Sequence, residues 1–265
     1  MDAIELLKQL EKDSCNCVFI DPPYNINVGK SKNNGFNYFN NHSKLFKELY
    51  RVCSENSFLI MTIRLSEAFK IYQDITNAGF IFVRDLFWNK NNRMSDFANA
   101  IPYVHENILI FKKGNPKPNV LEYIGEEYTR KGKYTQKAQC FGVGLKEISV
   151  IGKKTRKANT FINLDYDYII EAPNKTTMKY EERTEHPSQK PLKLLKVLIS
   201  FFSKEQDLIV DCFSGSGTTA LACKQLNRNF ICSDISKEYC NIANKRIEEV
   251  NQESMQSEAR HSSLS

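Results

Sequence analysis

The sequence lacks the features of an exported or membrane-bound protein. None of its apolar runs approaches the ~18 residues that a membrane-spanning helix requires. Its first residues, Met1–Glu5, contain neither a basic start nor the apolar segment of a secretory signal peptide. We therefore expect a cytoplasmic protein with no membrane partner.

The sequence is also poor in metal-binding patterns. It contains eight cysteines but no C-x-x-C pair, and only four histidines. Most of the cysteines have apolar neighbours, as Cys223 and Cys232 do. Such thiols are typical of reduced, packed side chains, so we expect no metal site and no disulfide framework.

Charge is unevenly distributed along the 265 residues. The net charge is only +6, yet residues 128–157 contain nine basic side chains and a single acid. Tyr128, Tyr134 and Phe141 lie among these charges. Clustered Lys and Arg favour a polyphosphate partner, although a solvated surface has a similar composition.

Helix-like and strand-like stretches alternate along most of the chain. Helical spacing is found at residues 4–10, 43–52, 66–78 and 237–250, after Pro191 and from about Thr218, and strand-like runs at 15–20, 58–63, 80–88, 107–111, 208–210 and 230–232. This alternation predicts a doubly wound α/β sheet. We expect two halves, residues 1–114 and 186–250, separated by an insertion at 115–185 and followed by a disordered tail at 251–265.

The second half contains a candidate cofactor site. An apolar strand at 208–211 leads into a turn with Gly215 and Gly217 and then into a helix. Asp234 ends the following strand, where a carboxylate can bind the hydroxyls of a ribose. The pattern predicts a cofactor that contains a nucleoside. The absence of G-x-G-x-x-G excludes an NAD-dependent oxidoreductase.

The first half contains a candidate catalytic turn, Asp21-Pro22-Pro23-Tyr24, directly after an apolar strand. The Asp21 carboxylate and the Pro22 carbonyl can accept hydrogen bonds from an exocyclic amino group and turn its lone pair towards an electrophile. The two prolines lack N–H donors and have fixed φ angles. Tyr24 offers a ring face to a base extruded from a duplex.

Together, D-P-P-Y and F-x-G-x-G resemble the motifs of the amino-group DNA methyltransferases. The catalytic motif precedes the cofactor loop, an order that resembles the beta class of N6-adenine methyltransferases. The resemblance implies a class I S-adenosylmethionine-dependent methyltransferase fold with circularly permuted motif order. It also implies that residues 115–185 form a target-recognition region. Its activity would be methyl transfer to N6 of an adenine flipped out of duplex DNA.

Further segments fit this family. They are Trp88–Lys90, His105–Asn107, Phe111–Gly114 and His186–Pro191. Cys212 and Ser233 depart from the family pattern, but neither removes a functional group that the reaction needs.

The resemblance assigns roles to individual residues. Asp21, Pro22, Pro23 and Tyr24 would be catalytic. Cofactor contacts would come from Asp2, Ala3, Asp21, Ser188, Lys190, Asp211, Phe213, Ser214, Gly215, Ser216, Gly217, Thr218 and Asp234. Asp2 and Ala3 would contact the adenine of the cofactor, Ser188 and Lys190 its methionine end, and Asp234 its ribose. Among the basic residues we expect DNA contacts from Lys30, Lys32, Arg130, Lys131, Lys133, Lys153, Lys154, Arg156 and Lys157.

Several alternatives stay open at this point. Cytosine N4 has the same amino-group chemistry, but family members that methylate it usually carry Ser at the position of Asp21. An RNA substrate fits the basic insertion less well. A catalytically inactive DNA-binding subunit would need neither motif. Besides double-stranded DNA, the resemblance allows a homodimer and a cognate restriction endonuclease as partners.

Overall fold

The computed structural model describes residues 1–23, 41–94, 103–119, 122–124, 129–135, 145–151, 155–157, 161–162 and 183–262. The chain forms two compact units. The first comprises Met1–Asn119 together with Thr160–Ser265, and the second comprises Val120–Asn159.

The first unit is built on a mixed sheet in the order β11-β10-β1-β2-β4-β3-β9. Its strands are β1 (Cys15–Ile20), β2 (Cys53–Ile63), β3 (Ile81–Met94), β4 (Tyr103–Lys113), β9 (Phe161–Ile162), β10 (Leu208–Asp211) and β11 (Asn229–Cys232). The pairs β1–β2, β1–β10 and β10–β11 are parallel, whereas β4 is antiparallel to both β2 and β3. The α/β sheet that the sequence predicts is therefore confirmed.

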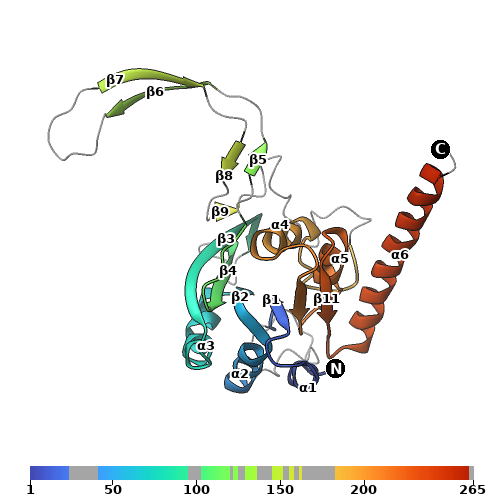
Figure 1. The fold of residues 1–265 in the computed structure, drawn as a ribbon. Coiled ribbons are helices and arrows are strands. Elements are labelled where there is room, and N and C mark those ends of the chain that lie inside the picture. Colours follow the sequence, from blue (N-terminus) through green and yellow to red (C-terminus); the bar gives the residue numbers. More distant parts are fainter. Residues whose placement is uncertain are drawn as a thin grey trace. The chain divides into compact units, whose positions relative to one another are not determined.

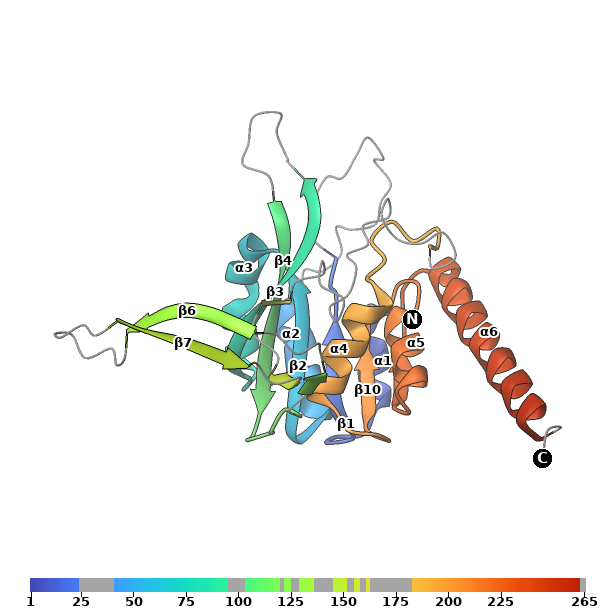
Figure 2. The same ribbon diagram turned by 90° about the horizontal axis from the view of Figure 1, so that it is seen from above.

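Helices cover both faces of this sheet (Figures 1 and 2). One face packs against α1 (Ala3–Gln9), α2 (His42–Val52) and α3 (Leu65–Asn77), and the other against α4 (Leu192–Phe202) and α5 (Thr218–Gln225). Side chains of β1 alternate between the two cores: Val18 and Ile20 join the first, Cys17 and Phe19 the second. This alternation follows from the two-residue period of a strand, and burial on both faces explains why β1 is a continuous apolar run.

The strands that carry the two principal motifs are neighbours. Val18 of β1 is paired with Val210 of β10. The chain leaves β10 through α5 on one face of the sheet, whereas the helix between β1 and β2 is α2 on the other face. The carboxyl ends of β1 and β10 therefore meet at a switch point of the sheet, which is where doubly wound folds bind ligands.

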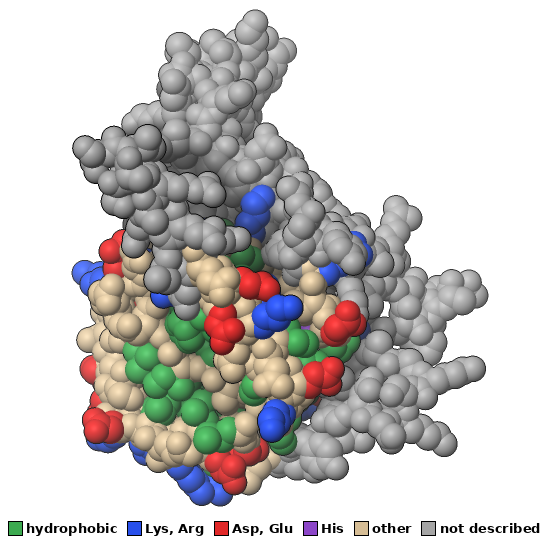
Figure 3. All heavy atoms as spheres, turned by 90° about the vertical axis from the view of Figure 1, so that its right-hand side faces the viewer, with side chains coloured by type: hydrophobic (Ala, Val, Ile, Leu, Met, Phe, Trp, Pro, Cys, Tyr) green, Lys and Arg blue, Asp and Glu red, His purple; other side chains and the backbone are tan. Residues whose placement is uncertain are grey.

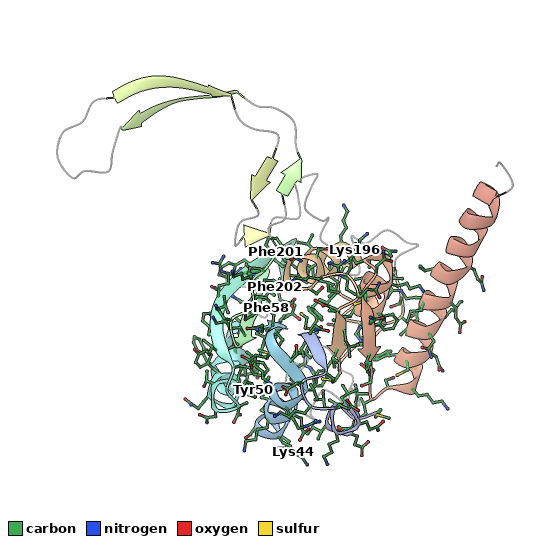
Figure 4. All side chains as sticks on the ribbon, in the orientation of Figure 1. Lys44, Tyr50, Phe58, Lys196, Phe201 and Phe202 are labelled. Carbon is green, nitrogen blue, oxygen red and sulfur yellow. The ribbon has the colours of Figure 1, made fainter. Side chains whose placement is uncertain are left out.

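The opposite edge of the sheet contains an ion pair between a buried lysine and an exposed acid. Nζ of Lys113, at the end of β4, lies 2.7 Å from Oδ1 of Asp13. It also donates to the carbonyls of Tyr50 and Cys53, at 3.0 and 2.6 Å. Figure 4 labels Tyr50 in this region, and Phe58 beside Phe202, whose ring centroids are 4.9 Å apart. These contacts stabilise the fold away from the carboxyl ends of β1 and β10.

The second unit contains two antiparallel strand pairs. β5 (Glu122–Ile124) pairs with β8 (Thr155–Lys157), and β6 (Thr129–Thr135) pairs with β7 (Leu145–Ile151). The unit falls within residues 115–185, which the sequence analysis assigns to the insertion.

The structure differs from the sequence-based expectations at two helix ends. α6 (Lys237–Ser262) continues past Val250, through residues expected to be disordered. That segment has no Gly or Pro, and its Gln, Glu, Met, Ala and Arg residues are good helix formers. α2 begins at His42, one residue before the expected start at 43, with Asn41 at the N-cap position.

The described cysteines form no disulfides: residues 15, 17, 53, 212, 223, 232 and 240 are all free. None of the helices in the described ranges is long and apolar enough to span a bilayer.

Candidate active site

A pocket opens where β1 and β10 end. It contains about 300 Å³ not occupied by protein atoms. Its walls come from three segments of the sequence: Phe19 and Asp21; His186, Ser188, Gln189, Lys190 and Leu195; and Asp211, Phe213, Ser214, Gly215, Ser216, Thr218 and Thr219. The catalytic and cofactor motifs therefore share one pocket.

Asp21 follows β1, and both of its carboxylate oxygens are engaged. Oδ1 accepts a hydrogen bond from Oγ1 of Thr62 in β2, at 2.5 Å. Oδ2 accepts one from Nζ of Lys190, also at 2.5 Å. A carboxylate offers about four acceptor sites, so these two donors do not exhaust its capacity. They do fix the orientation of the carboxylate.

Lys190 lies between two acids. Its Nζ is also 3.2 Å from Oε1 of Glu106, which is buried near the end of β4 that faces the pocket. Burial by itself would lower the pKa of Lys190. The charges of Asp21 and Glu106 and their hydrogen bonds outweigh burial and raise that pKa above its usual value. The side chain is therefore a permanent cation.

Asp211 supports the glycine turn. Its Oδ1 accepts from the backbone N–H of Phe213 at 2.9 Å, and its Oδ2 from Oγ1 of Thr219 at 2.5 Å. Burial raises the pKa of Asp211 to about 7, against these hydrogen bonds and helped by the charges of Asp21 and Asp234. The pocket therefore contains an acid that titrates near neutral pH.

The turn itself requires its two glycines. Gly215 has φ +48°, and a Cβ there would lie 2.7 Å from Nε2 of His186. Gly217 has φ +78°, and a Cβ there would lie 2.5 Å from the Cβ of Ala243 in α6. Positive φ is costly for other residues, so both positions combine a conformational and a steric demand for glycine.

Asp234 connects the turn with the end of β11. Its Oδ2 accepts from the Gly215 N–H at 2.9 Å and its Oδ1 from the Ser236 N–H at 2.8 Å. Its backbone carbonyl accepts from the N-terminal ammonium of Met1 at 2.8 Å. Asp2, next to Met1, caps α1 by accepting from the N–H groups of Ile4 and Glu5. The start of the chain is thereby held beside the Asp234 end of the site.

The glycine turn is also braced from α6. Nη1 of Arg246 donates to the carbonyl of Ser216 at 2.7 Å and lies 3.2 Å from Oγ1 of Thr218. No sequence motif singles out this arginine, because the contact depends on how α6 packs against α5.

The structure brings together most of the residues expected at the site. Those that line the pocket are Asp21, Ser188, Lys190, Asp211, Phe213, Ser214, Gly215, Ser216 and Thr218. Gly217 belongs to the turn and Asp234 accepts a hydrogen bond from it, whereas Ala3 is buried in the core and Pro22 is buried next to Asp21. Tyr24, Lys30, Lys32, Lys153 and Lys154 lie outside the described residues, and only the backbone is described at Arg130, Lys131, Lys133, Arg156 and Lys157.

Sequence reasoning missed Thr62, Glu106, Thr219 and Arg246 as site residues. Glu106 lies within the His105–Asn107 segment, and Thr219 directly follows Thr218 of the glycine turn, so both lie in or next to a recognised motif. Thr62 is a hydroxyl within the apolar run of β2. Its contact with Asp21 follows only from the β1–β2 register.

The face of the molecule shown in Figure 3 bears acidic and basic side chains interspersed around a hydrophobic group. The basic cluster at residues 128–157 belongs to the part whose side chains are not described. The DNA contacts expected there remain a prediction.

The pocket fits S-adenosylmethionine. Two acids, Asp21 and Asp211, and one cation, Lys190, line it, which suits a ligand with a sulfonium, an ammonium and a carboxylate group. The glycine turn allows close approach to its backbone, and Asp234 stands at the next strand end. A parallel sheet edge with these features, beside an Asp-Pro-Pro turn, defines a class I S-adenosylmethionine-dependent methyltransferase.

Comparisons with known proteins identify the family. A model of the N6/N4 DNA methylases matches residues 15–245. A type II methyltransferase, M1.MboII of Moraxella bovis, is 28% identical over 259 residues, covering 92% of this chain and 93% of the relative. The chain therefore belongs to the N6/N4 DNA methylase family.

Solved structures share the fold. The structure of M1.HpyAVI in complex with S-adenosylmethionine has a TM-score of 0.62 at 24% identity, covering 93% of this chain and 96% of that one. The cytosine-N4-specific PvuII DNA methyltransferase has a TM-score of 0.60 at 16% identity, covering 93% and 84%. These likenesses show the fold that this chain shares with both proteins.

Proposed function

We propose that this DNA methyltransferase modifies N6 of adenine, flipped out of duplex DNA, as the modification enzyme of a cytoplasmic restriction-modification system. S-adenosylmethionine is the methyl donor. The observation that carries the proposal is that the Asp21 carboxylate lies in the same pocket as the glycine turn. The N–H of Gly215 in that turn donates to Oδ2 of Asp234 at 2.9 Å. The name of M1.MboII, a type II methyltransferase, supports the restriction-modification context.

Asp21 has the part of a hydrogen-bond acceptor for the target amino group. The lone pair of an aromatic amino group is delocalised into its ring, which makes the nitrogen a weak nucleophile. Hydrogen bonds to Asp21 and to the Pro22 carbonyl draw the amino hydrogens out of the plane of the ring and localise the lone pair. Thr62 and Lys190 hold the carboxylate in one orientation, so little reorganisation is needed when the base arrives.

When bound, the cofactor would supply a methyl group on a sulfonium. The amino nitrogen would form the new N–CH3 bond, while the electrons of the broken S–CH3 bond stay on sulfur. One amino proton would pass to solvent. The cofactor would be held by Asp211, the 213–218 turn, Asp234, Asp2 and Ser188. Ionised Asp211 balances positive charge, and Phe19 and Leu195 exclude water from one wall of the pocket.

The proposed partner is double-stranded DNA. Its contacts are assigned to the basic residues 130, 131, 133, 153, 154, 156 and 157 in the insertion and to Lys30 and Lys32. Tyr24 is assigned to stacking on the flipped base. A homodimer and a cognate endonuclease complete the proposed set of partners.

Cytosine N4 is the second candidate, because the PvuII enzyme shares the fold at a TM-score of 0.60. Asp21 favours adenine, since cytosine-modifying members of the family usually have Ser there.

The test is methylation of unmodified genomic DNA by the purified enzyme with isotopically labelled S-adenosylmethionine, followed by digestion to nucleosides and chromatography. We expect the label in N6-methyldeoxyadenosine. Label in N4-methyldeoxycytidine would replace the proposal with the second candidate, and unlabelled DNA would contradict both.

A further inference from the structure

We propose that Lys190 and Glu106 are positioning residues for Asp21. Glu106 anchors the ammonium group of Lys190, and that ammonium group fixes the direction of Asp21 Oδ2. The inference rests on the proposed role of Asp21 and holds whether the target base is adenine or cytosine. It gives Lys190 a different task from contact with the methionine end of the cofactor.

The three side chains form a buried chain of charges. The distances are 2.5 Å from Lys190 Nζ to Asp21 Oδ2 and 3.2 Å from Nζ to Glu106 Oε1. Exposed side-chain fractions are 9% for Lys190, 17% for Asp21 and 4% for Glu106. Asp21 is the most exposed of the three, and both Asp21 and Lys190 line the pocket.

The sequence positions explain why this cluster can be rigid. Glu106 lies in β4, where its neighbour Asn107 pairs with Ile63 of β2, one residue beyond Thr62. Lys190 precedes Pro191, the N-cap residue of α4, whose leucines 194, 195 and 198 are buried in the second core. Asp21 is therefore held from two neighbouring strand ends and from the start of a packed helix.

The charges need one another. Lys190 interacts electrostatically with both Asp21 and Glu106, and Asp211 interacts with Asp21. Without the ammonium group, the Asp21 and Glu106 carboxylates would lose the cation that lies between them, and like charges close together cost free energy. The charge and the direction of the Asp21 carboxylate, which attract the amino hydrogens of the base, therefore depend on Lys190.

The positioning role and the cofactor role of Lys190 make different predictions. A lysine that binds the methionine end contributes mainly to the affinity for S-adenosylmethionine. A lysine that orients Asp21 contributes to the rate of methyl transfer at saturating cofactor and sets the lower limb of its pH profile. At saturating cofactor the enzyme is fully loaded at every pH, so the titration of Asp211 in the free enzyme does not affect the pH profile of the methyl-transfer rate.

The experiment compares four variants of the full-length protein: Lys190→Met, Lys190→Arg, Glu106→Gln and Lys113→Met. The last is a matched control, because Lys113 is also a buried lysine paired with an acid but lies at the opposite edge of the sheet. Circular dichroism establishes folding, and calorimetry gives the dissociation constant for S-adenosylmethionine without any turnover. Single-turnover methylation of unmodified DNA is then measured across pH at saturating cofactor.

We expect Lys190→Met to slow methyl transfer about 100-fold at pH 7 and to move the lower limb of the profile up by about one pH unit or more. Its dissociation constant for the cofactor should stay within about threefold of wild type.

The other variants should behave differently. Lys190→Arg keeps the charge, so the acidic limb of the pH profile should stay in place although the rate falls. Glu106→Gln should slow the reaction without moving this limb to higher pH, because the substitution removes a negative charge. Lys113→Met should leave rate and limb unchanged.

A Lys190→Met protein that binds the cofactor tenfold or more weakly, yet methylates at the wild-type rate when saturated, would overturn the inference. So would an unmoved lower limb in this variant. If Lys190→Met does not fold, an upward shift of the limb in Glu106→Gln would contradict the proposal by itself. A wild-type enzyme that methylates neither base would instead refute the proposed function.

Discussion

The hydroxyl of Thr219 lies 2.5 Å from Oδ2 of Asp211, and the two side chains are almost completely buried. A hydroxyl and a backbone N–H are the recorded donors to this acid, and burial raises its pKa to about 7. The acid therefore changes charge in the range where the enzyme works, and this makes cofactor binding and stability depend on pH.

Affinity for S-adenosylmethionine should rise with pH. The cofactor is cationic and favours ionised Asp211, and the raised pKa of that acid leaves it mostly protonated at pH 6. Between pH 6 and pH 8 the dissociation constant should fall about tenfold, as the ionised fraction rises through a pKa near 7. Calorimetry at several pH values measures it. Asp211→Asn is the control, in which this dependence should disappear, and a flat profile in the wild type would contradict the assignment.

Ionisation of Asp211 should lower the free energy of unfolding at alkaline pH. Its folded-state pKa of about 7 is above the ordinary value of 3.8, so between these values the folded protein binds more protons than the unfolded chain. The contribution of Asp211 to stability therefore decreases as pH rises from 4 to 7 and stays low above that. Asp211→Asn should raise the free energy of unfolding by about 2 kcal/mol at pH 8. It should gain nothing at pH 4. Denaturant titrations at both pH values compare the two proteins, and an equal gain at both would exclude titration as the cause.

The hydrogen bond from Thr62 to Asp21 should matter for catalysis more than for folding. Thr62→Val keeps the shape of the side chain and removes the donor to Oδ1. We expect methyl transfer to slow about tenfold, because a hydrogen bond to a charged group contributes about 1.5–3 kcal/mol. Cofactor affinity should not change. Single-turnover rates and calorimetry separate the two quantities, and an unchanged rate would show that Thr62 does not orient Asp21.

The glycine turn should tolerate no side chain at its first glycine. Gly215→Ala would place a methyl group 2.7 Å from the His186 imidazole at a φ of +48°, and we expect cofactor affinity to fall at least about tenfold. Gly114→Ala is the matched control, with a φ of +67° and a Cβ that would meet Glu55, but far along β4 from Glu106. It should lower the melting temperature and leave cofactor affinity unchanged. Equal losses of affinity in both variants would indicate a general loss of folding.

The sequence predicts the frame of the site better than its internal contacts. Asp21, Gly215 and Asp234 are recognisable because each ends a strand or opens a turn, and local patterns determine such positions. The pairing of β1 with β10 brings the two motifs together in the structure. Thr62, Glu106 and Arg246 reach the site through strand register and helix packing. Contacts between segments so far apart in the sequence are not encoded in any local pattern.

Lys190 illustrates the difference most clearly. The sequence places it in a recognisable His186–Pro191 segment and, by resemblance, beside the cofactor. In the structure its ammonium group contacts Asp21 and Glu106, which are 169 and 84 residues away. The helix at residues 251–262 shows the same limit, since composition alone suggested disorder there.

The most direct test of the account is base-resolution sequencing of DNA from a methylation-free host that expresses either the wild-type protein or Asp21→Ala. The account predicts N6-methyladenine at one short sequence motif with the wild type and none with the variant, although the variant still binds S-adenosylmethionine. N4-methylcytosine with the wild type, or undiminished adenine methylation with Asp21→Ala, would contradict it.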